Sequence, residues 1–226
     1  MVYHPDNVRS ILDQVKADGR TSLTAPECKV VCDAYSIPLP PEGLANSADE
    51  AVEIAGRIGY PVALKIVSPD ILHKTEAGGV LTGISSADEV MSGYDLVIAN
   101  AHAYKSDAVI TGVQIQKMLS ADDALEVIVG AVTDQSFGKL VAFGLGGILV
   151  EVLKDITFRL APTTVDDALS MLDSIQAAEI LKGVRGSRPV DRQALATVIV
   201  NVSNLVDDFP EIQEVDLNPL LAGPDG

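Results

Sequence analysis

Apolar residues follow two different periods along this chain, and the period changes from one segment to the next. A helical period of three to four residues occurs in residues 8–15, 24–35, 47–58, 86–104 and 191–206. The alternation or short apolar runs typical of strands occur in residues 60–67, 80–84, 109–118, 125–133, 139–143, 155–161 and 212–217. Thr24, Ser47 and Ser86 each stand three positions before a Glu, a capping-box pattern that predicts where three helices begin. Helices and strands interleave, so the pattern predicts an α/β (α+β) fold.

The composition limits the classes of protein that are compatible with this chain. Hydrophobic residues make up 47% of the 226 positions and charged residues 21%, which argues against intrinsic disorder. Asp and Glu number 32 against 16 Lys and Arg, for a formal net charge of -16, so we expect no nucleic-acid or membrane partner. The longest apolar stretch, residues 140–153, is too short to cross a bilayer. Cys28 and Cys32 are the only cysteines, and we expect buried thiols in a cytoplasmic protein.

Lys65 is the first residue that suggests chemistry. It interrupts an apolar strand, so its ammonium needs a partner such as phosphate, unless it reaches solvent at a sheet edge. The loop of residues 73–80 follows it closely and contains His73, Lys74 and the pair Gly78-Gly79. Paired glycines let backbone N–H groups approach a phosphate, although such turns are also common without a ligand. His73 is either a phosphate carrier or an ordinary exposed loop residue.

Two later strands carry further polar positions. Glu214, Asp216 and Asn218 fall on one face of a strand, where their oxygens would suit Mg²⁺ or simply form a solvated surface beside a turn at Asn218-Pro219. Arg159 shares a strand face with Asp155, so it either binds a phosphoryl oxygen or forms a surface ion pair.

Taken together, several segments resemble a known family. Residues 59–66 (GYPVALKI) and 68–80 (SPDILHKTEAGGV) are similar to the ATP-grasp β subunit, or β domain, of NDP-forming (ADP-forming) acyl-CoA synthetases, in the succinyl-CoA synthetase superfamily. Segments 143–147, 151–155, 158–162 and 216–220 match in the same order, and the resemblance extends over about residues 20–222.

The resemblance implies an ATP-grasp fold of two lobes with a nucleotide cleft between them. Residues 21–110 would form the N-terminal lobe, and residues 1–20 with 111–226 the C-terminal lobe, truncated before a strand that usually completes the Mg²⁺ site. The resemblance implies phosphate contacts from Lys65, Lys74, Ala77, Gly78 and Gly79. Backbone groups of Gln116 and Met118 would read the adenine of ATP or ADP, and Glu126 would lie near the ribose or the hinge. Arg159 would face the transferred phosphoryl group, Asp216 and Asn218 would hold Mg²⁺, and His73 would be transiently phosphorylated.

The resemblance also implies a reaction. The family interconverts acyl-CoA, ADP and phosphate with acid, CoA and ATP through a phosphohistidine. The main phosphohistidine belongs to a CoA-binding α subunit or domain. This sequence has no Gly-x-Gly-x-x-Gly fingerprint of a CoA-binding segment, so we expect activity only in a hetero-oligomer with that partner. Two alternatives are a stand-alone ATP-grasp carboxylate ligase and a catalytically silent nucleotide-binding or scaffold domain.

Overall fold

The chain forms two compact units, which are described separately. The computed structural model describes residues 2–120, 124–147, 154–184 and 187–226. Residues 4–34 and 38–119 form the N-terminal unit, and residues 1–3, 35–37 and 120–226 form the C-terminal unit. These boundaries differ from the expected ones, because residues 4–20 and the strand at residues 112–117 belong to the N-terminal unit.

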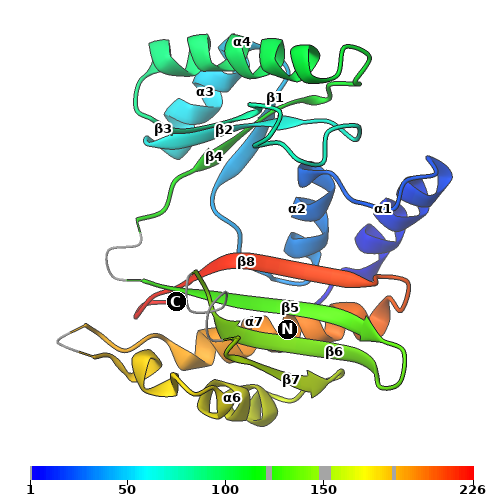
Figure 1. Cartoon of the computed structure of the whole chain (residues 1–226), viewed down its shortest axis with the longest axis vertical. Helices are drawn as coiled ribbons and strands as arrows, with labels where there is room; N and C mark the ends of the chain where they lie inside the picture. Colours follow the sequence, from blue (N-terminus) through cyan, green and yellow to red (C-terminus); the bar gives the residue numbers. More distant parts are fainter. Residues whose placement is uncertain (1, 121–123, 148–153, 185–186) are drawn as a thin grey trace. The chain divides into compact units, whose positions relative to one another are not determined.

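An antiparallel sheet of four strands forms the centre of the N-terminal unit. The strands β1 (Glu42–Ala45), β4 (Gly112–Lys117), β2 (Val62–Val67) and β3 (Val80–Ile84) follow one another in this order across the sheet. Helices α3 (Ala48–Ile58) and α4 (Ala87–Tyr104) cover one face (Figure 1). The core on that side includes Leu64, Ile66, Val113 and Ile115, each fully buried. Alternation places the polar residues of the same strands on the opposite face.

The capping-box patterns do mark the starts of three helices. Ser47 and Ser86 accept hydrogen bonds from the N–H groups of Glu50 and Glu89. The two Glu carboxylates, however, accept from the N–H one residue before each cap, at Asn46 and at residue 85. Each serine therefore satisfies a free helix N–H, whereas each glutamate binds the N–H just before the cap, one position earlier than in the standard box.

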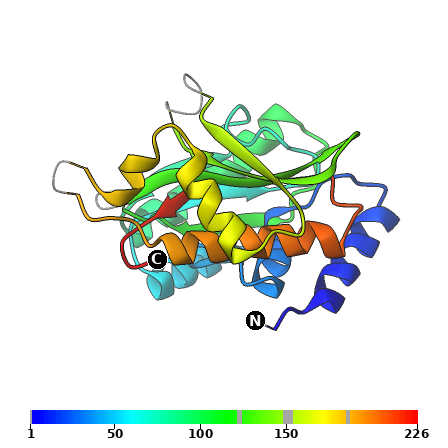
Figure 2. The same ribbon diagram turned by 90° about the horizontal axis from the view of Figure 1, so that it is seen from below.

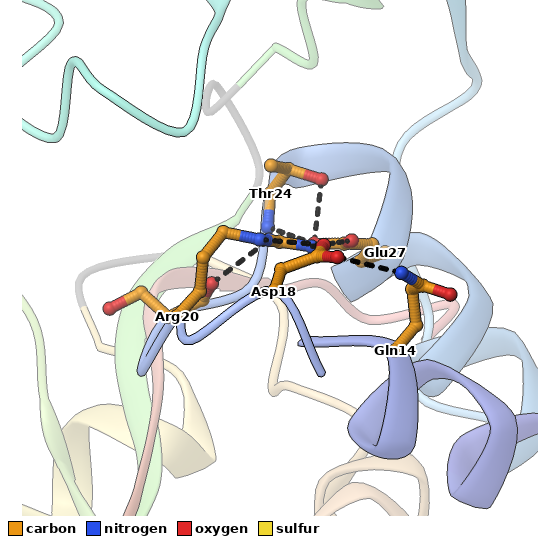
Figure 3. Close-up of polar contacts among 6 residues, drawn as sticks. Gln14, Asp18, Arg20, Thr24 and Glu27 are labelled. Atoms are coloured by element: carbon orange, nitrogen blue, oxygen red, sulfur yellow. Dashed lines mark hydrogen bonds and ion pairs between the residues drawn. The ribbon is translucent and has the colours of Figure 1, made fainter. Parts of the chain in front are cut away.

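Helices α1 (Pro5–Ala17) and α2 (Ala25–Ala34) also belong to the N-terminal unit, and a polar cluster joins them (Figure 3). Arg20 bonds to Glu27 at 2.7 Å and to Asp18 at 2.9 Å. The backbone N–H of Thr24 also donates to Glu27, which completes the start of α2. Hydrogen bonding to Arg20 is the main reason that the pKa of Glu27 falls from 4.5 to about 2.

A second antiparallel sheet forms the C-terminal unit. Its order is β7 (Ile156–Leu160), β6 (Gly138–Leu145), β5 (Leu125–Asp134) and β8 (Glu214–Ala222). Helices α6 (Val165–Ser174) and α7 (Arg192–Asp208) cover one face, as Figures 1 and 2 show, and the short 3₁₀ helix η1 (Ala178–Lys182) lies between them in sequence. The buried residues toward these helices include Val127, Val129, Val141 and Phe143.

Aromatic stacking assigns two separate chain segments to the C-terminal unit. The rings of Tyr3 and Tyr35 stack with centroids 4.6 Å apart, and Tyr35 makes an edge contact with Phe209. The Tyr3 hydroxyl donates to Asn201 of α7, and the Tyr35 hydroxyl donates to Asp208. Tyr3 and Tyr35 thus hold their segments against α7 through both ring contacts and hydrogen bonds.

The structure departs from the predicted elements in several places. Strand β4 begins at Gly112 instead of residue 109, and β8 continues through Asn218-Pro219 to Ala222, so no turn interrupts it. Strand β1 and helix α6 were not predicted. Cys32 is buried as expected, whereas Cys28 is exposed, which corrects the expectation of two buried thiols. Among the residues described, no helix combines the length and the apolarity needed to cross a membrane.

Candidate functional site

Polar side chains form a connected chain on the face of the N-terminal sheet that is turned away from α3 and α4. Lys65 on β2 lies opposite Gln114 on β4, and Gln116 lies opposite Glu42 on β1. The Lys65 ammonium donates to Gln116 Oε1 at 2.6 Å. The Nε2 groups of Gln114 and Gln116 donate to Oε2 of Glu42 at 2.8 and 2.7 Å. Lys65 is therefore paired within a polar network, as an ammonium among apolar strand neighbours requires.

Glu42 and Gln114 were not among the residues that the sequence indicated. Strand β1 has only four residues, too few to show a period in the sequence. The alternation in β4 was visible, because Gln114 and Gln116 flank the fully buried Ile115. Two amides on one face of a central strand are the signal that would have identified this network.

Lys74 adds a second cation to the same region. Burial and the neighbouring Lys65 ammonium lower the pKa of Lys74, while Cys28 and Glu42 act in the opposite direction. Burial likewise lowers the pKa of Lys65, and Glu42 partly offsets this. Two partly desolvated ammonium groups near one carboxylate carry an excess of positive charge. An anion such as a phosphate would stabilise the protonated form of both lysines.

The loop before β3 is internally hydrogen-bonded. The N–H groups of Ala77, Gly78 and Gly79 donate to the carbonyl oxygens of residues 73–75 at 3.2, 3.0 and 2.8 Å. These N–H groups therefore have partners already, and the structure does not present them for the predicted phosphate cradle. The loop contributes the Lys74 side chain to the site instead. His73, at the start of the loop, is exposed.

The two glycines are needed for packing. A Cβ on Gly79 would lie 2.4 Å from Ile66 Cγ2, so no side chain fits there. Gly78 has a φ of +61°, and its carbonyl accepts from Asn100 Nδ2 at 2.8 Å. Glycine at both positions lets the loop close onto β2 and α4, which brings Lys74 near Lys65.

The segment expected to read adenine has most of its donors already paired. Gln116 lies inside a central strand, between Ala63 of β2 and Glu42 of β1, so its side chain is the part that faces the lysines. The Met118 N–H donates to Pro61 O at 3.0 Å. The structure therefore does not present the Met118 N–H as a free donor for a base.

In the C-terminal unit, Glu214, Asp216 and Asn218 alternate along β8 and are all exposed. Partial burial, together with the Glu214 carboxylate, raises the pKa of Asp216. Carboxylate and amide oxygens are hard ligands that suit Mg²⁺, and a cation would relieve the repulsion between the two carboxylates. Within the described ranges, no three His, Cys, Asp or Glu side chains gather as a metal site of their own. A magnesium ion here would thus need the Asn218 oxygen and oxygens from water or ligand as well.

Arg159 lies on the other face of this sheet from Asp216. Arg159 pairs with Val141 of β6, whereas Asp216 pairs with Gly130, which in turn pairs with Ala142 of β6. Opposed residues of antiparallel strands share a face, and adjacent residues of one strand do not. Arg159 therefore shares the helix-covered face with the fully buried Val141.

The hydrogen bonds of Arg159 agree with this placement. Its guanidinium donates to the hydroxyls of Ser170 and Ser174 on α6, at 3.2 and 3.3 Å. Asp155 does not pair with it, because its carboxylate accepts from the backbone N–H groups of residues 176 and 177. Arg159 therefore connects β7 with α6, on the opposite face of the sheet from Asp216.

Glu126 lies against the glycine turn that follows β6. Its carbonyl accepts from the Gly146 N–H at 2.7 Å, and a Cβ on Gly147 would lie 3.2 Å from Glu126 Oε2. The rest of this region, including the matched residues 151–153, lies outside the described residues.

Comparisons with known proteins agree on the kind of protein this chain resembles. A model of the ATP-grasp domain matches residues 14–226. The β subunit of acetate–CoA ligase (ADP-forming) I from Pyrococcus furiosus is 47% identical over 96% of this chain and 92% of that protein. The 4-hydroxybutyrate–CoA ligase (ADP-forming) of Nitrosopumilus maritimus is 44% identical over 94% of this chain, which spans only 30% of that longer protein.

Solved structures show the same similarity. Acetyl-coenzyme A synthetase 1 of Ca. Korarchaeum cryptofilum, in complex with coenzyme A and Ca-AMPCP, has a TM-score of 0.89 and 39% identity, over 96% of this chain and 94% of that chain. A second structure of that enzyme contains coenzyme A and Mg-AMPPCP, with its phosphohistidine segment pointing towards the nucleotide-binding site. Its TM-score is 0.82 at 36% identity, over 96% of this chain and 93% of that chain.

Proposed function

Because the chain belongs to the ATP-grasp family, among the β subunits and β domains of ADP-forming acyl-CoA ligases, we propose that it is the nucleotide-binding part of such an enzyme. The reaction interconverts acyl-CoA, ADP and phosphate with acid, CoA and ATP. A CoA-binding α partner, in a hetero-oligomer, would carry the acyl chemistry and the main phosphohistidine. The name "subunit beta" of the Pyrococcus relatives and the longer single-chain relatives support a partner of this kind.

The pair Lys65 and Lys74 is the observation that carries the proposal. Both ammonium groups lie near one carboxylate, Glu42, and burial lowers the pKa of each. The phosphates of ADP or ATP supply the negative charge that this arrangement lacks. Lys65 is held by Gln116, and Lys74 is brought beside it by the closed glycine loop.

Asp216 and Asn218, with Glu214 beside them, would hold Mg²⁺. Bound magnesium neutralises charge on the nucleotide phosphates. Asp216 and Glu214 provide the negative charge for this ion. Partial burial, and after it the neighbouring Glu214 carboxylate, raises the pKa of Asp216, and a bound cation would offset both effects.

His73 is the proposed relay for the phosphoryl group. In that step the P–N bond of a phosphohistidine breaks while a P–O bond forms to the terminal phosphate oxygen of ADP, and the imidazole nitrogen retains the electron pair. Its exposure at the start of the Lys74 loop supports access to a partner's phosphohistidine.

Calorimetric titration of the chain with ADP and ATP, with and without Mg²⁺, tests nucleotide binding. We expect Lys65→Ala and Lys74→Ala each to weaken ADP binding by about tenfold or more, as loss of a charge-assisted hydrogen bond predicts. Lys16→Ala is the matched control, because Lys16 is exposed on α1 of the same unit. An unmodified chain that binds neither nucleotide would refute the proposal, as would lysine variants with unchanged affinity.

A further inference from the structure

We propose that Glu42 is a positioning residue of the nucleotide-phosphate site: it orients Lys65 through Gln116 and serves as the shared counter-charge of Lys65 and Lys74. This inference rests on the proposed function and deepens it. Glu42 belongs to the same site as Lys65, although the two residues lie on different strands. Glu42 stands on β1, whereas Lys65 stands on β2, and β4 separates the two strands.

The direction of each hydrogen bond follows from the chemistry of the groups. A lysine ammonium only donates, so the Gln116 atom that lies 2.6 Å from it must be the amide oxygen. The amide nitrogen of Gln116 then faces Glu42, and an ionised carboxylate only accepts. Glu42 therefore fixes which way the Gln116 amide points. With the amide reversed, two donors would face one another at Lys65.

A second donor holds Glu42 itself in place. Gln114, which is buried, donates to the same carboxylate oxygen as Gln116 does. The carboxylate is thus restrained by two amides from a central strand, and it has little freedom to swing toward either lysine. Lys65 uses one N–H for Gln116, which leaves two of its three N–H groups for phosphate oxygens. A direct ion pair with Glu42 would cover more of that positive charge.

The electrostatics of the region depend on few groups. Lys65 lies on β2, Lys74 on the following loop, and Glu42 on β1; helix α2 contributes Cys28 and Cys32. Both thiols keep their protons near neutral pH, because desolvation of the sulfur raises the pKa of Cys32 and also of Cys28, although Cys28 as a whole residue is exposed. Glu42 is therefore the carboxylate among these groups that opposes the effect of burial on both lysines. Replacing it with a neutral residue of the same size leaves two lysines without that support.

The first test is the decrease of ADP affinity at alkaline pH, measured without Mg²⁺ by calorimetry between pH 7 and pH 11. Affinity falls as the lysines lose their protons, so the midpoint reports their pKa in the free protein. In Glu42→Gln we expect the midpoint of this decrease to move down by about one pH unit. At a pH above both midpoints, ADP then binds about tenfold more weakly to the variant than to the unmodified chain. Glu53→Gln is the matched control, because Glu53 is exposed on α3, across the sheet. Superimposable profiles for Glu42→Gln and the unmodified chain would overturn the proposal.

The second test separates orientation from charge. If Glu42 acts through Gln116, then Glu42→Gln should have a smaller effect on ADP affinity in a Gln116→Met background than in the unmodified chain. Equal effects in the two backgrounds would refute the link through Gln116. Circular dichroism of each variant, compared with the unmodified chain, checks that the chain is folded.

A nucleotide-free measurement keeps this inference separate from the proposed function. The ε-carbon NMR signals of Lys65 and Lys74, assigned with Lys65→Arg and Lys74→Arg, report their titration directly. Glu42→Gln should move both titrations to lower pH whether or not ADP binds. Unmoved lysine titrations would reject the role of Glu42. Absent ADP binding with shifted titrations would reject the nucleotide proposal alone.

Discussion

Replacing Gly79 with alanine should disrupt the closure of the Lys74 loop. The new Cβ would lie 2.4 Å from Ile66 Cγ2, more than 1 Å inside the usual carbon–carbon contact of about 3.5–4.0 Å. Ile66 is fully buried, and the Lys74 carbonyl lies 3.2 Å from the same Cβ, so neither neighbour has room to move freely. Overpacking of this kind costs about 1–3 kcal/mol.

Urea unfolding followed by circular dichroism measures this loss, and ADP calorimetry measures its effect on the site. We expect the free energy of unfolding to fall by about 1–3 kcal/mol, and ADP binding to weaken because Lys74 moves with the loop. Gly56→Ala is the matched control: a Cβ there meets nothing within 4 Å. Because Gly56 lies inside α3, this control should stabilise the protein by about 0.5–1 kcal/mol.

A double-mutant cycle identifies the clash. Ile66→Ala is destabilising by itself, but it removes Cγ2, so adding Gly79→Ala in that background should cost much less than in the unmodified chain. Full stability and unchanged ADP affinity in the single Gly79→Ala variant would show that the glycine is not needed for packing, and the explanation of the loop would be wrong.

Two further predictions follow from the polar contacts. The pKa of Glu27 is lowered from 4.5 to about 2, so the stability it contributes is present above pH 4.5 and is lost as the pH falls toward 2. Urea unfolding at pH 7, 4 and 2.5 tests this. In Glu27→Gln the free energy of unfolding at pH 7 should be about 1–2 kcal/mol lower, and it should fall less steeply with decreasing pH than in the unmodified chain. An identical dependence on pH in the two proteins would contradict this prediction. Arg159→Gln should change ADP affinity by no more than about twofold. It should, however, speed the amide hydrogen exchange of residues 165–174 in α6, because the variant loses the hydrogen bonds to Ser170 and Ser174. A large loss of ADP affinity with α6 intact would return Arg159 to the phosphate site.

The sequence predicted most of the long elements, because their periods repeat often enough to be recognised. The capped helices at residues 47–58 and 86–104 and the hairpin of β5 and β6 are found close to the predicted positions. Strand β1 was missed because its four residues show no clear alternation. Strand β8 was ended too early, because Pro219 suggested a turn, whereas an edge strand tolerates proline.

The site residues show a different limit. Alternation predicted that Arg159 and Asp155 share a strand face, but β7 begins only at Ile156. Alternation also does not say which side of the sheet the helices will cover. That choice depends on α6, which packs against β7 and accepts hydrogen bonds from Arg159. The pair Gly78-Gly79 suggested contacts to a ligand, yet its closest neighbours are Ile66 and Asn100 of the same unit. Local pattern identifies unusual residues, and tertiary packing decides what they contact.

The most direct test of the proposed activity is ATP formation by this chain combined with its CoA-binding α partner. Purified complex, acyl-CoA, phosphate, ADP and Mg²⁺ are mixed, and ATP is measured over time. We expect ATP to accumulate only when both chains are present, and Lys65→Ala to reduce its rate sharply while Lys16→Ala does not. A stable complex that makes no ATP from any acyl-CoA tested, or one in which Lys65→Ala keeps the full rate, would contradict the account.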